Sequence, residues 1–197
     1  MDSFKVLVGV AAIALLSGCS DTGSSTEPSP SPGPSASPEP QETVPGLTEP
    51  TCLAANLLSF SQLPQSTPNA PDPMPIPAGF EPTRVVTCDG DWDAGVVNHT
   101  VTWVEEHRTG NLEAVLAGYA LPSEPRDQQT CTVDQRTPPI VWLVDDSNRG
   151  MRAPELPTGE CGAYKWDAIT AIHDLPVTER IVHQIPVAPE VEARWEQ

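Results

Sequence analysis

Positive charge is scarce in this sequence. Its 197 residues include 10 Lys and Arg against 27 Asp and Glu, which gives a formal net charge of −17 at pH 7. A surface this acidic repels the phosphate backbone of nucleic acids and the headgroups of anionic lipids. We therefore expect no nucleic-acid partner.

The short motifs of common enzyme classes are also missing. The sequence contains no GxSxG nucleophile elbow, no HExxH zinc motif, no glycine-rich phosphate loop and no CxxC pair. We therefore assign no catalytic residue, no cofactor and no metal ligand from the sequence. Enzymatic activity stays open at this stage, and a non-catalytic protein is favoured.

No apolar run is long enough to cross a bilayer, which takes about 20 residues. The apolar run at residues 6–16 follows Lys5 and has the length of the central part of an export signal. It ends in Leu16-Ser17-Gly18-Cys19, which resembles the lipobox of bacterial lipoproteins. The resemblance implies that residues 1–18 are a signal peptide removed before Cys19. It also implies a diacylglyceryl group on the Cys19 thiol.

This lipid would hold the mature protein at the extracytoplasmic face of a cell membrane, which is the localisation and the membrane partner that we predict. Two or more acyl chains give lasting attachment, since each buried methylene contributes about 0.8 kcal/mol. The alternative is an ordinary cleaved signal peptide with an incidental cysteine at position 19.

Proline is abundant, with 24 residues in the chain. Eight of them fall in residues 20–50, among Ser, Thr, Glu and Gly, with very few large apolar side chains. Such a composition buries too little apolar surface to offset the entropy of ordering. We predict that residues 19–50 are the lipidated cysteine and a disordered tether, with a reach on the order of 95 Å if fully extended.

Four cysteines remain once Cys19 is assigned to lipid, and an even number in an exported chain predicts two disulfides. Three pairings are open. We favour Cys52 with Cys88 and Cys131 with Cys161, because these pairs close loops of moderate length.

Residues 51–82 come before the main domain. Leu53, Leu57, Leu58 and Phe60 have near-helical spacing and predict a short helix over residues 51–60. Seven prolines follow between residues 64 and 82. They predict an extended segment that wraps a surface and adds little to the core.

Sequence patterns predict the elements of the domain over residues 83–185. Short apolar or β-rich runs predict strands at 83–88, 96–106, 140–144, 151–153 and 180–185. Helical spacing predicts helices at 111–119, capped by Asn111, and at 163–175. Residues 186–197 are predicted to be a C-terminal tail.

The resulting order predicts an α+β fold, with a small antiparallel or mixed sheet and two helices on one face. From the long strand onward the order is βαββαβ, which is the order of a ferredoxin-like fold. On the long strand, Val97, His99, Val101 and Trp103 are predicted to share one face.

Two stretches of the domain carry a second resemblance. The segment from Trp103 through Leu175, especially residues 142–146 (WLVDD) and 157–162 (PTGECG), looks like uncharacterised secreted proteins and lipoproteins of high-GC Gram-positive bacteria. That group implies no function for this chain.

Two sets of residues have some features of metal sites. Asp89, Asp91 and Asp93 alternate as in a calcium loop, but Ala94 stands where the loop needs glycine. His99 and His107 would lie roughly 26 Å apart on an extended strand, too far to share a metal. Neither set supports a metal site.

These observations together predict a membrane-anchored extracytoplasmic lipoprotein whose domain binds another envelope protein or a small ligand. The alternative is an envelope hydrolase or a thioredoxin-like accessory protein. Thr137-Pro138-Pro139 before the strand at 140–144 is similar to the proline-strand-hairpin-helix end of thioredoxin-like proteins. A pocket lined by Asp, Glu or His would favour the enzyme, and an apolar patch around Trp92 or Trp195 would favour the binding protein. The oligomeric state is not predicted.

Overall fold

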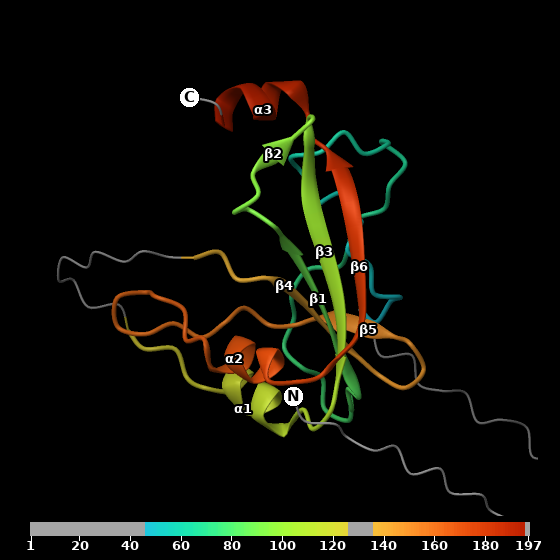
Figure 1. Ribbon diagram of the computed structural model, residues 1–197. Coiled ribbons are helices and arrows are strands. Elements are labelled where there is room, and N and C mark those ends of the chain that lie inside the picture. The colour runs from blue at the N-terminus through green and yellow to red at the C-terminus, as the bar shows by residue number, and fades with distance from the viewer. Residues whose placement is uncertain (1–45, 126–135, 196–197) are drawn as a thin grey trace, which may run out of the picture. The chain divides into compact units, whose positions relative to one another are not determined.

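A six-stranded sheet organises the computed structural model, which describes residues 46–125 and 136–195 (Figure 1). The strands are β1 (Arg84–Gly90), β2 (Val96–Val97), β3 (Thr100–Thr109), β4 (Ile140–Val144), β5 (Gly150–Arg152) and β6 (Val177–Pro186). The helices are α1 (Glu113–Tyr119), α2 (Asp167–His173) and α3 (Pro189–Trp195). The predicted α+β class is confirmed.

All strand pairs are antiparallel, and the strand order is β2-β3-β1-β4-β5, with β6 also paired to β3. From β3 onward the chain order is strand, helix, strand, strand, helix, strand. This does not make a ferredoxin-like fold, because β1 lies between β3 and β4. The expectation of a ferredoxin-like arrangement is therefore wrong, since a strand from outside the βαββαβ unit takes the centre of the sheet.

The long strand predicted at 96–106 is two strands joined by a tight turn. Asn98 and His99 both have positive φ values, 51° and 61°, and reverse the chain between β2 and β3. Asn and His adopt this left-handed region more readily than most residues do. His99 therefore does not share a strand face with Val101 and Trp103.

Helices α1 and α2 lie together over one face of the sheet (Figure 1). Side chains from β1 and β4 meet the apolar faces of both helices there. The buried members of this cluster include Val85, Leu143, Met151, Val115, Ile169 and Ile172. Both helices are shorter than predicted. The Asn111 side chain still accepts a hydrogen bond from the Glu113 N–H at 2.9 Å at the start of α1.

The opposite face of the sheet is covered by the chain that precedes β1. Cys52 and Leu58 of this segment are fully buried there, together with Val86, Cys88 and Trp142 of the sheet. The proline-rich stretch at residues 64–82, which we expected only to wrap a surface, also contributes to the cores, with Ala70 buried in this cluster and Phe80 buried beside α1 and α2.

The helix predicted over residues 51–60 is not formed, and turns take its place. The reason is tertiary. The Asn56 side chain makes two hydrogen bonds of 2.9 Å to the backbone of Ala70. The Ala55 N–H also donates to the Pro68 carbonyl at 3.0 Å. These contacts hold residues 54–58 against the proline-rich segment, and the chain there forms turns closed by the Leu57 and Leu58 N–H groups on the Ala54 carbonyl.

The disulfide between Cys52 and Cys88 is confirmed, and both cysteines are fully buried. It links the irregular segment directly to the central strand β1. The second predicted pair includes Cys131, which lies outside the described residues, so the structure describes one disulfide where two were predicted. Cys19 and most of the predicted tether also lie outside them.

The predicted C-terminal tail is instead the end of β6 and the helix α3. Pro189 occupies the first position of α3, where proline fits because its missing N–H would have no helical partner. Val191 is buried with Val101 and Val187 in a third cluster. In the described residues, 46–125 and 136–195, no helix is both long enough and apolar enough to cross a membrane.

We expect the double substitution Cys52→Ala and Cys88→Ala to lower the free energy of unfolding by about 4 kcal/mol, because the disulfide spans a separation of 36 residues. Urea unfolding followed by tryptophan fluorescence measures this change. A loss below about 1 kcal/mol would contradict a structural role for this bridge.

Candidate functional site

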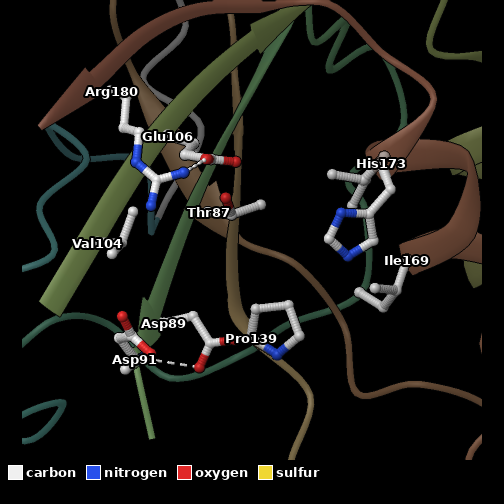
Figure 2. A pocket seen from close by; sticks show the side chains of 11 residues that line it. Thr87, Asp89, Asp91, Val104, Glu106, Pro139, Ile169, His173 and Arg180 are labelled. Atoms are coloured by element: carbon white, nitrogen blue, oxygen red, sulfur yellow. Dashed lines mark hydrogen bonds and ion pairs between the residues drawn. The ribbon is translucent and has the colours of Figure 1, made fainter. Parts of the chain in front are cut away.

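A groove of about 320 Å³ lies between α2 and the strands β1, β3 and β6 (Figure 2). Its apolar lining comes from Val104 of β3, from Pro139 just before β4, and from Ile169 and Ile172 of α2. A volume of this size is in the range of small-molecule sites.

Polar side chains surround these walls because strand residues alternate between the two faces of the sheet. On β1, Thr87 and Asp89 face the groove, while Val86 and Cys88 face the second core. Figure 2 shows His173 on the helix side of the groove, with Asp89 and Asp91 together at one end.

Glu106 forms ion pairs with two arginines. Its Oε2 accepts a hydrogen bond of 2.6 Å from Arg108, and its Oε1 accepts one of 2.8 Å from Arg180. Figure 2 shows the pair with Arg180 at the opposite end of the groove from Asp89. Both carboxylate oxygens are therefore occupied by neighbouring cations.

Arg108 fastens α2 to the sheet. Its Nη1 donates to the carbonyls of Ile172, His173 and Leu175 at 3.3, 3.0 and 2.9 Å. Carbonyls at the C-terminus of a helix lack helical partners and carry partial negative charge, so a buried guanidinium satisfies them well. The arginine thus links β3 to the C-terminal end of α2.

Burial in the groove alters the pKa of Asp89. Partial desolvation raises the pKa of its carboxyl above the ordinary value, and this effect outweighs the hydrogen bonds from Gly90 and Trp92 and the charge of His173. The Gly90 N–H donates to its Oδ1 at 2.8 Å. A carboxyl in this state is a weaker acid than a solvated aspartic acid.

A second polar cluster lies on the other face of β3. The carboxylate of Glu105 lies within hydrogen-bond distance of two imidazole Nε2 atoms, that of His107 at 2.8 Å and that of His183 at 3.3 Å. His107 also lies 3.9 Å from Glu179. Among the described residues, no group of three or more His, Cys, Asp or Glu side chains has the arrangement needed to hold a metal ion.

The residues weighed as metal ligands are separated in the structure. Asp89 and Asp91 line the groove, while Asp93 lies in the exposed loop after them. His99 is at the turn before β3 and contacts Glu192 at 2.8 Å, whereas His107 pairs with Glu105 near the far end of β3.

Sequence reasoning missed Glu106, Arg108 and Arg180. Alternation along β3 places Glu106 and Arg108 on one face, and this could have been read from the sequence. The pairing of Glu106 with Arg180 depends on the register of β3 with β6, in which these two residues lie opposite each other.

Comparison of the chain with protein-family models, curated proteins and solved structures found no match.

We expect Arg108→Met to lower the free energy of unfolding by roughly 3 kcal/mol, because it removes a buried charge partner of Glu106 and the donor to three carbonyls. Arg180→Met is the matched control. It breaks the exposed pair with the same Glu106 and should cost less than about 1 kcal/mol. Urea unfolding of both variants measures the difference, and equal losses would contradict the proposed role of Arg108 in holding α2.

Proposed function

We propose that the protein is a lipoprotein anchored to the extracytoplasmic face of a cell membrane through Cys19, and that its domain binds a small ligand without changing it chemically. The anchor rests on the lipobox and the preceding apolar run. The predicted tether would lift the domain clear of the lipid headgroups.

Binding is favoured over catalysis by the hydrogen bonds and ion pairs of two polar side chains in the groove, Thr87 and Glu106. A hydrolytic site needs a nucleophile in contact with a base, or a carboxylate free to act on water. Thr87 supplies the hydroxyl of the lining, and among the described residues its side chain makes no hydrogen bond to a histidine or a carboxylate. Both oxygens of Glu106 are engaged by arginines.

The cysteines support a structural role rather than a redox role. Thiol–disulfide exchange requires access to a sulfur atom, and Cys52 and Cys88 are both fully buried. We propose that the second disulfide joins Cys131 to Cys161. Cys161 is disulfide-bonded, and Cys52 and Cys88 are bonded to each other, which supports this pairing.

A small-molecule fragment set, screened by NMR on protein with labelled isoleucine methyl groups, tests binding in the groove. We expect fragments that carry both an apolar ring and a charged group to shift the methyl signals of Ile169 and Ile172. Val104→Trp should abolish these shifts, because the larger ring fills the groove from the strand side. Fragments that bind equally well to this variant would contradict the groove as the site.

One observation favours a second candidate function. The raised pKa of Asp89 is a property of carboxyls that act as general acids, so a hydrolase with Asp89 in that role is the alternative. Chromogenic p-nitrophenyl esters, phosphates and glycosides distinguish the two. Turnover that Asp89→Asn abolishes would establish the hydrolase, while equal background rates in both proteins agree with a binding protein.

The anchor has its own test in a bacterial host that processes lipoproteins. We expect the protein to fractionate with membranes and to begin at Cys19 with the mass of a diacylglyceryl group added. Cys19→Ser should remove the lipid, since serine has no thiol to accept it, whereas the neighbouring Ser20→Ala should keep it. An unmodified Cys19 in the membrane fraction would contradict the lipoprotein assignment.

A further inference from the structure

Four aromatic side chains from separate parts of the chain meet next to α3. Phe60 lies at their centre, with ring centroids 5.8 Å from Trp92, 6.0 Å from Trp103 and 5.9 Å from Trp195. Trp92 also contacts Trp103 at 6.3 Å and Trp195 at 6.2 Å. Edge-to-face contacts at these distances stabilise aromatic pairs beyond the burial of their surface.

Two members of the cluster form its fixed base. Trp103 of β3 is 4% exposed, and its indole N–H donates to the Cys52 carbonyl at 3.1 Å. The Phe60 carbonyl accepts a hydrogen bond of 2.9 Å from the Ala188 N–H just before α3. The base therefore belongs to the sheet and to the disulfide-linked segment.

The other two members are presented to solvent. Trp92 is 50% exposed and Trp195 is 47% exposed. Trp92 lies in the loop between β1 and β2. Gly90 pairs with Trp103 and Val96 pairs with Val101, so the five residues 91–95 lie opposite a single residue of β3. The loop is therefore too long to follow the strand and projects outward. Trp195 is held in place by α3, whose Val191 is buried. The planes of the two exposed rings are 89° apart.

A cleft of about 390 Å³ lies beside these two rings, and its lining consists of both rings with Gly95, Val96, Val101 and Glu192. Glu192 is the charged side chain of the lining. Its carboxylate is held by His99 at 2.8 Å, and it is 17% exposed. Arg194, the basic residue next to Trp195 in the chain, turns back along α3, where its Nε donates to the Glu190 carbonyl at 3.2 Å.

We propose that this cleft binds the quaternary ammonium group of a small free molecule such as choline. The electron-rich faces of tryptophan rings attract cations within about 6 Å, and perpendicular rings can surround a cation from two sides. The Glu192 carboxylate, which His99 holds in place, adds an acidic group to the lining. The net charge of −17 makes approach of a cation favourable from a distance. This site is separate from the groove beside α2, and the inference goes beyond the binding function proposed above.

The geometry favours this ligand over three others. The cleft has the volume of a small-molecule site, whereas a protein partner would need a broader surface. None of the ring pairs is coplanar, with interplanar angles between 45° and 89°, so the cluster offers no extended flat platform for a sugar chain. The acidic surface also repels membranes that contain anionic lipids.

The test uses the full chain in a non-ionic maltoside detergent, which contains no ammonium group. Choline chloride is titrated at constant total chloride while the indole N–H signals of the five tryptophans are followed by NMR. We expect saturable shifts of Trp92 and Trp195, with a dissociation constant on the order of 1 mM. The neutral analogue 3,3-dimethylbutan-1-ol has the same shape without the charge and should bind at least about 5-fold more weakly.

Variants locate the site. Trp92→Ala and Trp195→Ala should each weaken choline binding at least about 5-fold, and Glu192→Gln should weaken it by a smaller factor, since the rings remain. Trp166→Phe is the control. Trp166 packs against the core beside α1 and α2, away from the cleft, and should leave choline binding unchanged.

Three outcomes would overturn the proposal, and the first two need no variant to fold. They are equal binding of choline and its neutral analogue, shifts of the two indoles by N-acetylglucosamine but not by choline, and choline binding that survives both tryptophan substitutions. Vesicles of phosphatidylcholine form a further arm. Binding to these vesicles without binding to free choline would assign the cleft to a lipid headgroup and reject a free ligand.

Discussion

The antiparallel pairing of β3 is the constraint on which the rest of this structure depends. This strand pairs with β1, β2 and β6, so its register positions both the groove beside α2 and the aromatic cluster next to α3. Because side chains alternate along a strand, β3 contributes Trp103 and Glu105 to one face and Val104, Glu106 and Arg108 to the other. One strand thereby supports the base of the aromatic cluster on one side and a wall of the groove on the other.

The two faces of the sheet are stabilised by different means. On one face, α1 and α2 bury an apolar cluster, and Arg108 links β3 to the C-terminal carbonyls of α2. On the other face, a segment with little regular structure fills the second core. It depends on the Cys52–Cys88 disulfide and on hydrogen bonds from Asn56. A disulfide compensates there for the apolar contacts that a short irregular segment cannot supply.

Sequence patterns located the strands and helices of the domain well, because apolar periodicity reports which face of each element is buried. They failed where tertiary contacts override local preference. The spacing of Leu53, Leu57 and Leu58 predicted a helix, but the chain there is held in turns by contacts with residues 68–70. In the tail after residue 186, Val187, Val191 and Trp195 have helical spacing that the prediction of a tail overlooked, and Val191 of α3 is buried with Val101.

The sequence by itself determined the α+β class, the order of the main elements and the acidic net charge, since all of these depend on composition and local spacing. It left three pairings of the cysteines open, and the structure shows that Cys52 is bonded to Cys88. Only the tertiary structure decided which distant residues meet. The insertion of β1 between β3 and β4, the ion pairs of Glu106 with Arg108 and Arg180, and the contact of Trp92 with Trp195 all follow from strand register and from packing across the sheet. Register and packing join residues far apart in the chain, and no local pattern specifies such pairs.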